Sequence, residues 1–115
     1  MEISSFKTNR KAKLIGKNGS AEAQLMELSI EEAGVRTPRG AKEGTELELE
    51  FEIPALGDFT TLCVKTVVTS RHNSEDEIYL KLAFIELNSF EQSVIQDFLD
   101  YKKRLIKMGK LHRSA

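Results

Sequence analysis

The chain has 115 residues, of which 30% are charged, and its formal net charge is −1. This length suits one domain with one hydrophobic core, and the charge balance excludes a protein drawn as a whole to nucleic acid or anionic membranes. The sequence has no signal peptide and no apolar run of about eighteen residues, which predicts a cytoplasmic protein without membrane insertion. The single cysteine, Cys63, lies in an apolar run and is expected to be a buried structural thiol.

The first predicted β-structure is a hairpin that follows a polar segment. Residues 1–9 are expected to be a flexible N-terminal arm. Two short strand-like runs then flank Asn18-Gly19, and both residues of this pair tolerate the positive φ that a type I′ turn requires. The sequence therefore predicts a hairpin centred on Asn18-Gly19. The polar stretch that follows, residues 27–37, is either a binding loop or a tight turn.

Residues 46–53 give the strongest strand pattern in the chain. Apolar and acidic residues alternate in TELELEFEIP, with the period of two that places one face in a core and the other in water. The glutamates are expected to form a solvated face that resists edge-to-edge pairing, rather than a cation-binding stripe. Further strands are predicted in FTTLCVKTVVTSR and IYLKLAFIEL, on either side of the turn HNSEDE. Short strands at this spacing favour a barrel or a sandwich.

Residues 89–108 carry an apolar stripe at three- and four-residue steps, which predicts an amphipathic helix. Asn88 is the expected N-cap, answered by Glu91 in a capping box, and Gly109 is expected to end the helix. The stripe is wider than one small barrel covers, so a homodimer through this helix is one expectation. The charges after Asp100 are all positive, which suits either the negative end of the helix dipole and a soluble tail or a docking surface for an acidic partner. These residues are Lys102, Lys103, Arg104, Lys107, Lys110 and Arg113.

The expected organisation is a single domain without catalytic chemistry. His72 and His112 lie in a turn and in the tail, without metal-ligand spacing. The sequence has neither a phosphate-binding glycine loop nor a nucleophile elbow. We therefore expect no enzyme, no cofactor and no metal site. The expected boundaries are a domain at 10–109, with its barrel at about 10–86 and its helix at about 89–108, and a basic tail at 110–115.

In the order of its elements, the chain resembles the PilZ domain, a bacterial receptor fold for the second messenger cyclic di-GMP. The resemblance covers about residues 6–108 and implies a mainly β fold: a small antiparallel six-stranded β-barrel followed by a long C-terminal amphipathic α-helix. PilZ domains carry Asp/Asn-x-Ser-x-x-Gly in the loop after the hairpin, and ELSIEEAGV is similar to this motif. Glu27 lies at the acidic position, Ser29 at the serine and Glu32 at the glycine.

The family also has Arg-x-x-x-Arg just ahead of its first strand. Here Arg10 takes the second arginine position and Phe6 the first, while Lys7 and Lys11 offer an alternative pair at the same spacing. The resemblance implies that Arg10 and these lysines, with Lys13 nearby, grip the phosphates of cyclic di-GMP, since a guanidinium binds a phosphate and stacks on a base. The serine loop would supply hydrogen bonds to the same ligand.

Several positions depart from the family pattern. Phe6 lacks the charge-assisted contact of an arginine, worth about 1.5–3 kcal/mol. Glu32 in place of glycine costs roughly 1–2 kcal/mol if the position needs positive φ, and its carboxylate repels phosphates by on the order of 1–4 kcal/mol. Glu27 is one methylene longer than Asp or Asn, and Lys81 takes the place of a glycine in the last strand. These departures predict a loss of roughly two to four decades in affinity for the ligand.

Three functions are therefore open. The first is a non-enzymatic PilZ-type signalling module with weakened or lost cyclic di-GMP binding, an adaptor that contacts proteins of motility, secretion or polysaccharide machinery. The second is a genuine cyclic di-GMP receptor with a variant site built on Arg10 and neighbouring lysines. The third is a small barrel that binds single-stranded nucleic acid, which requires aromatic residues on a basic strand face. The acidic face at residues 46–52 argues against this third function.

Overall fold

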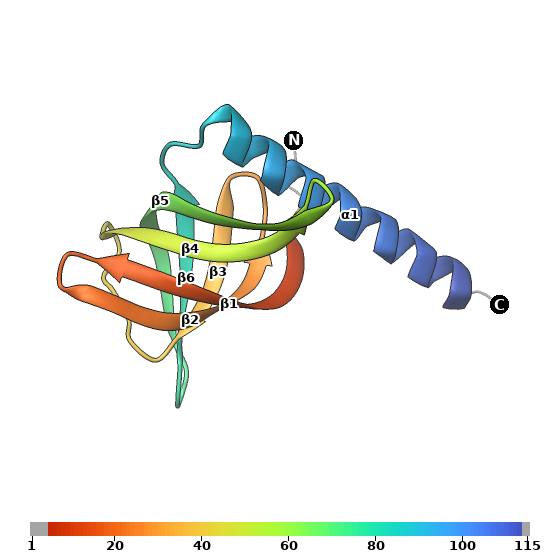
Figure 1. Cartoon of the computed structure of the whole chain (residues 1–115). Coiled ribbons are helices and arrows are strands. Elements are labelled where there is room, and N and C mark those ends of the chain that lie inside the picture. Colours follow the sequence, from red (N-terminus) through yellow and green to blue (C-terminus); the bar gives the residue numbers. More distant parts are fainter. Residues whose placement is uncertain (1–4, 114–115) are drawn as a thin grey trace.

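The chain folds as a closed antiparallel β-barrel with one helix across an end (Figure 1). The computed structural model describes the backbone of residues 5–113 and the side chains of residues 5–107. The strands follow one another around the barrel in the order β1-β2-β3-β6-β5-β4. This arrangement confirms the predicted six-stranded barrel and C-terminal helix. The elements are β1 (Phe6–Gly16), β2 (Gly19–Leu28), β3 (Glu32–Thr37), β4 (Glu46–Ala55), β5 (Asp58–Asn73), β6 (Ile78–Phe84) and α1 (Ser89–Arg113).

The alternating sequence of β4 builds one wall of the core. Leu49, Phe51 and Ile53 are buried, and the glutamates between them point to the outer wall. The predicted division of this strand into a buried face and a wet face is confirmed. Because inward and outward residues alternate along every strand, the outer wall of the barrel is where polar side chains from neighbouring strands meet.

The expectation that Cys63 is buried is wrong. β5 alternates with Leu62 and Val64 in the core, so Cys63 between them lies on the exposed outer wall. Its Sγ donates a hydrogen bond to Oε2 of Glu48 on β4, at 3.3 Å. Partial desolvation, and then the hydrogen bond and charge of Glu48, raise the pKa of the Cys63 thiol to about 11. The sequence pattern was misleading here because β-branched residues occupy both faces of β5, so the apolar run does not show which of its residues face the core.

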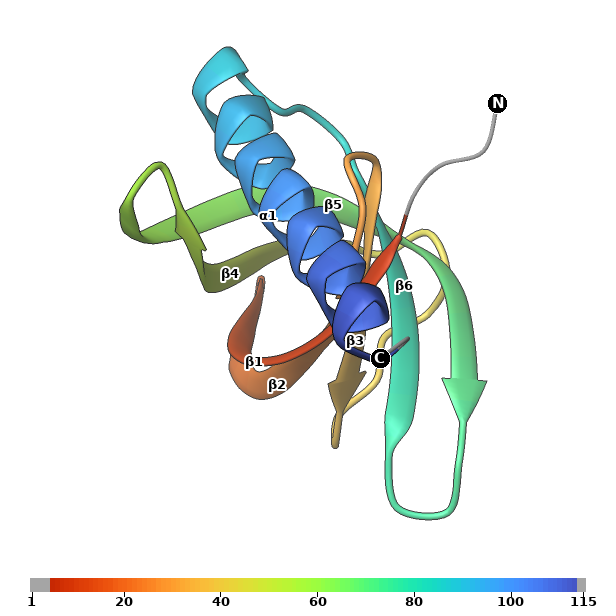
Figure 2. The ribbon, with the colours of Figure 1, turned by 90° about the vertical axis from the view of Figure 1, so that its right-hand side faces the viewer.

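The helix α1 begins with the predicted capping box. The amide of Glu91 donates to Oδ1 of Asn88 at 2.8 Å, and the amide of Asn88 donates to Oε1 of Glu91 at 3.0 Å. Farther along, Asp97 accepts a hydrogen bond from the amide of Leu56 in the β4–β5 hairpin, at 2.8 Å. Figure 2 shows α1 crossing the end of the barrel beside this hairpin. Its buried residues there are Val94, Ile95, Phe98 and Leu99.

The first strand begins earlier, and the helix ends later, than predicted. β1 begins at Phe6, because Phe6 packs against the core and Lys7 pairs with β2, so residues 6–9 belong to the sheet and not to the arm. At the other end α1 continues through Gly109 to Arg113, into the predicted tail. One glycine costs a helix only about 1 kcal/mol, and the residues around it favour helix.

The first hairpin turns one residue earlier than predicted. Its two central residues are Lys17 and Asn18, and neither has the positive φ that a type I′ turn requires. The positive φ falls on Gly19, at 132°, where Gly19 pairs with Gly16. The glycine therefore starts β2 instead of filling the turn.

The C-terminal half of α1 extends beyond the barrel (Figure 1). Tyr101, Leu105 and Ile106 are 39%, 42% and 49% exposed. Tyr101 and Leu105 continue the stripe that is buried where α1 crosses the barrel, at Val94 and Phe98, so part of the predicted apolar face is uncovered. No helix in the described part of the chain has the length and apolar character needed to span a bilayer.

Candidate functional site

The residues predicted to bind a ligand are divided between the two faces of the barrel wall. Residues paired across neighbouring strands lie on the same face. An outer row runs through Lys7 on β1, Glu27 on β2, Gly34 on β3 and Lys81 on β6. The structure therefore brings Lys7 and Glu27 into one row and adds a lysine that the predicted site did not include.

A β-bulge in β2 places Glu27 on this outer face. Leu25 pairs with buried Val35, and two residues later Glu27 pairs with Gly34, so the register shifts by one between them. Without the shift, Glu27 would share the core side with Leu25, because side chains alternate along a strand. The bulge thus turns the Glu27 carboxylate outward, toward β6.

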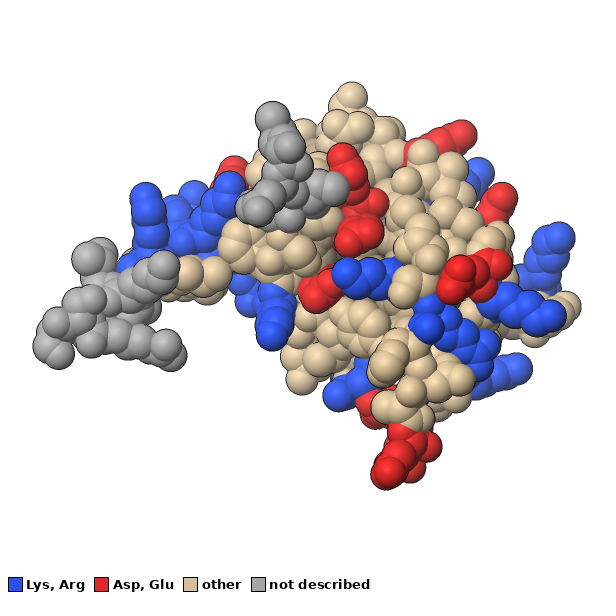
Figure 3. All heavy atoms as spheres, turned by 180° about the vertical axis from the view of Figure 1, so that it is seen from behind, with Lys and Arg blue, Asp and Glu red and all other residues tan. Residues whose placement is uncertain are grey.

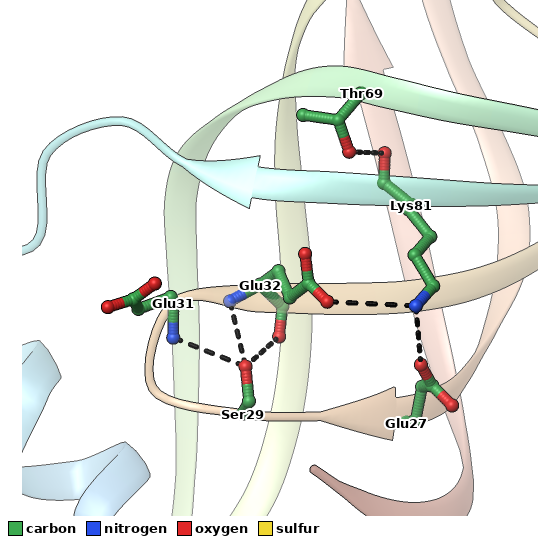
Figure 4. A network of polar contacts seen from close by, with 6 residues as sticks. All are labelled: Glu27, Ser29, Glu31, Glu32, Thr69 and Lys81. Atoms are coloured by element: carbon green, nitrogen blue, oxygen red, sulfur yellow. Dashed lines mark hydrogen bonds and ion pairs between the residues drawn. The ribbon is translucent and has the colours of Figure 1, made fainter. Parts of the chain in front are cut away.

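Lys81 joins the two acidic residues of the predicted site (Figure 4). Its Nζ lies 3.5 Å from Oε1 of Glu27 and 3.7 Å from Oε1 of Glu32. The backbone of Lys81 is held as well, because Thr69 Oγ1 donates to its carbonyl at 3.2 Å. Two carboxylates from the ends of β2 and β3 therefore share one lysine, whose side chain is 41% exposed.

Tyr79 on β6 packs on the same outer face, over Gly34 and beside Glu27. Its hydroxyl lies over Gly34, in the place that a Cβ on that residue would fill, and it donates a hydrogen bond to Glu27. Partial burial, followed by the charge of Glu27 and this hydrogen bond, raises the pKa of Tyr79 to about 12. A Cβ at Gly34 would also lie 2.7 Å from Cγ of Glu27. The missing side chain at Gly34 thus allows two β6 residues to hold Glu27.

The hydroxyl of Ser29 makes all of its hydrogen bonds within its own loop. It is fully buried, and its Oγ accepts hydrogen bonds from the amides of Glu31 and Glu32, at 3.3 and 3.0 Å. The same Oγ donates to the carbonyl of Glu32 at 3.1 Å. A serine hydroxyl has one donor and two acceptor sites, so these three bonds use its full capacity. Ser29 shapes the β2–β3 loop and has no free group for a ligand.

Arg10 lies beneath α1 and not beside Glu27. It pairs with buried Leu25, which places it on the core side of β1. Its guanidinium carbon lies 5.5 Å from the ring centroid of Phe98 on α1, within the range of a cation–π contact. The Nε of Arg10 is buried and has no hydrogen-bond partner among the described residues. Arg10 therefore connects β1 to the helix.

The three predicted lysines lie on the outer wall in separate rows. Lys7 is exposed and lies opposite Glu27 on β2. Lys11 is exposed and belongs to the next row along β1, and Lys13 lies farther along, opposite Glu50 on β4. Of the three, Lys7 shares the row that contains Glu27 and the ion pairs.

The chain is similar in structure to several solved proteins at low sequence identity. It matches MotI, the inhibitor of motility from Bacillus subtilis, with 12% identity and a TM-score of 0.77 over 90% of this chain and 52% of MotI. It matches YcgR from Escherichia coli, solved in complex with cyclic di-GMP, with 12% identity and a TM-score of 0.79 over 100% of this chain and 50% of YcgR. It also matches the PilZ domain of YcgR with cyclic di-GMP, with 10% identity and a TM-score of 0.72 over 96% of this chain and 97% of that domain. The chain has a PilZ-like fold.

The chain spans about half the length of MotI and of the longer YcgR chain. No protein-family model matches the sequence, and no curated protein sequence matches it either. The PilZ-like fold is therefore visible in the structure and in the order of the elements, while the sequence has little similarity to these proteins.

In this PilZ-like barrel, Glu32 does not occupy a strained backbone position. It begins β3, and among the described non-glycine residues positive φ occurs at Leu56, in the β4–β5 hairpin. The predicted conformational cost at Glu32 therefore does not arise. The other predicted effect of Glu32, repulsion of phosphates by its carboxylate, remains, and Lys81 partly neutralises that charge.

The sequence identifies Lys81 as a departure from the PilZ pattern but does not indicate its ion pairs. It likewise does not indicate the roles of Tyr79 and Gly34. The signal was a lysine at a glycine position in the last strand, close to two glutamates that also depart from the pattern. Their proximity depends on the β3–β6 pairing, in which Gly34 lies opposite Lys81. That register is a property of the closed barrel and not of any short motif.

Proposed function

We propose that this chain is a non-enzymatic PilZ-type signalling module in which an internal ion-pair network takes the place of cyclic di-GMP. The observation that carries the proposal is Lys81 between Glu27 and Glu32, at 3.5 and 3.7 Å. Lys81 is shared between the two carboxylates, so each of them is only partly neutralised on the face where the family resemblance places a ligand with two phosphates, although Lys7 lies in the same row. Like charges this close disfavour binding of the ligand.

Two further observations support a weakened ligand site. The hydroxyl of Ser29 is fully engaged within its own loop. Arg10 is engaged by Phe98 of α1, so a grip on phosphate would require it to leave the helix. In this proposal the residues that correspond to ligand contacts stabilise the barrel and its helix instead.

The proposed output is contact with another protein through the free half of α1. This part of the helix presents Tyr101, Leu105 and Ile106, together with the basic residues that follow Asp100. An exposed apolar strip flanked by cations suits an acidic protein surface or a second copy of the chain. Light scattering of the purified protein separates these partners: a monomeric mass at high concentration contradicts the homodimer, and a dimeric mass that Leu105→Glu reduces to monomer supports it.

A second candidate, a cyclic di-GMP receptor with a variant site, has two observations in its favour. Two of the similar structures contain cyclic di-GMP. In this chain the buried Nε of Arg10 has no hydrogen-bond partner among the described residues, so the guanidinium retains a donor. Lys7 and Lys11 lie exposed on the same strand and would supply further positive charge.

Calorimetric titration with cyclic di-GMP separates the two functions. The experiment uses the wild-type chain, Arg10→Ala, and Lys65→Ala as a control for the loss of one exposed cation on β5. The PilZ domain of YcgR, solved with this ligand, serves as the positive control. The proposal predicts no heat of binding at near-millimolar ligand. Binding in the micromolar range that Arg10→Ala removes and Lys65→Ala retains contradicts the proposal and establishes the receptor.

A further inference from the structure

A cavity of about 680 Å³ opens at the end of the barrel that α1 does not cover. In an antiparallel barrel successive connections alternate between the two ends. The β2–β3 loop with Ser29 and the β4–β5 hairpin therefore lie at the end crossed by α1. The β1–β2 hairpin and the β3–β4 loop (residues 38–45) lie at the opposite end and surround the cavity (Figure 1). The cavity is thus separate from the network around Lys81.

Small residues line part of the cavity wall. Its apolar floor consists of the partly buried Leu47 together with Leu14 and Leu80, which are buried in the core. The walls contain four glycines, and two of them, Gly19 and Gly44, have φ of 132° and 90°. These conformations favour glycine, so the turn geometry itself keeps side chains out of the opening. The other small wall residues are Gly16, Gly40, Ala21 and Ala41.

The rim of the cavity is positively charged. Lys17 and Arg39 line it, and Glu46 is its single carboxylate among the lining residues. The guanidinium of Arg71 lies against Gly40, on the other side of the β3–β4 loop, where a neighbouring hollow of about 430 Å³ is also lined by Lys42 and by the carboxylate-bearing Glu43. Figure 3 shows basic side chains at this end of the barrel, with acidic ones among them.

None of these four cations has a carboxylate within ion-pair distance among the described residues; the ion pairs found there involve Arg36 and Lys81. Lys17, Arg39, Lys42 and Arg71 therefore outnumber the two carboxylates, Glu43 and Glu46, that line the two hollows. Cations that converge on a concave, partly apolar site favour binding of an anion.

We propose that this cavity binds a small organic anion, of about the size of a mononucleotide, with a flat apolar body and a phosphate or carboxylate group. The body would lie on the floor formed by Leu14, Leu47 and Leu80, and the anionic group would meet Lys17 and Arg39 at the rim. The volume lies within the range of about 300–1,000 Å³ that is usual for small-molecule sites, and mouths of β-barrels are a common place for them. This inference does not depend on the proposed function.

The test is a titration of the ¹⁵N-labelled chain with guanosine monophosphate, followed by amide chemical shifts. Saturable shifts are expected for residues 16–20 and 39–46, because they surround the cavity. Guanosine, which lacks the anion, is expected to bind about tenfold or more weakly, and Arg39→Ala is expected to cause a similar loss. Lys65→Ala, which removes an exposed cation outside the cavity, is expected to leave the affinity unchanged.

A cavity-filling variant makes the test independent of charge. Ala21→Ile retains all the rim cations and adds a β-branched side chain to a strand position that lines the cavity. The proposal predicts that this variant keeps its circular dichroism spectrum and loses the binding. Wild-type affinity in Ala21→Ile, inorganic phosphate binding as tightly as guanosine monophosphate, or shifts confined to the face around Glu27 and Lys81 would each overturn the proposal.

Discussion

Replacement of Gly34 by alanine tests the packing that holds Glu27 in place. A Cβ at this position would overlap the Tyr79 hydroxyl and lie 2.7 Å from Cγ of Glu27. Tyr79 must then move off β3 and give up its hydrogen bond to Glu27. Added atoms in a filled space cost about 1–3 kcal/mol, and we expect Gly34→Ala to lower the free energy of unfolding by an amount in that range.

The assay is urea unfolding followed by far-ultraviolet circular dichroism, since the chain has no tryptophan for fluorescence. A matched background isolates the cause of the loss. In Tyr79→Leu the shorter side chain no longer reaches Gly34, while the contact with Cγ of Glu27 at 2.7 Å remains, so Gly34→Ala is expected to cost less there than in the wild type. The reasoning predicts a coupling free energy of about 0.5–3 kcal/mol between the two positions. An equal cost of Gly34→Ala in both backgrounds would refute it.

Three further predictions follow from hydrogen bonds in the structure. Because the pKa of Tyr79 is raised from about 10 to about 12, the unfolded chain loses this proton first, and stability falls as the pH rises from 10 toward 12; Tyr79→Phe should lack this part of the alkaline loss in urea unfolding at a series of pH values. Asn88→Ala removes the cap of α1 and should lower the free energy of unfolding by about 0.5–2 kcal/mol, and a loss below 0.2 kcal/mol would contradict the capping box. With a pKa of about 11, the Cys63 thiol should react slowly with Ellman's reagent near pH 8, and Glu48→Gln should accelerate the reaction; an unchanged rate would mean that Glu48 does not control the thiol.

The fold could be predicted where a short sequence pattern has a single physical cause. The alternation in β4 and the capping box at Asn88 and Glu91 are examples, because a buried face and a helix start each depend on a few neighbouring residues. The length of β1 was underestimated, because its first residues are polar and are ordered by pairing with β2. Gly109 was read as a stop signal although the surrounding residues continue the helix.

The arrangement of the site was less predictable, because bulges and pairing decide which face each residue occupies. The register shift beyond Leu25 turns Glu27 outward, and Arg10 opposite Leu25 turns inward to Phe98. No short motif contains this information. The Lys81 ion pairs likewise require β3 and β6 to be neighbours, which only the closed strand order establishes.

Removal of the two carboxylates tests the central claim most directly. In Glu27→Asn combined with Glu32→Gly, Lys81 loses both partners and is free to meet a phosphate, and the loop regains the PilZ pattern at these positions. Loss of the like-charge repulsion, on the order of 1–4 kcal/mol, predicts that calorimetry detects cyclic di-GMP binding to the double variant under conditions in which the wild type gives no heat of binding. A folded double variant that gives no heat of binding under the same conditions would contradict the account.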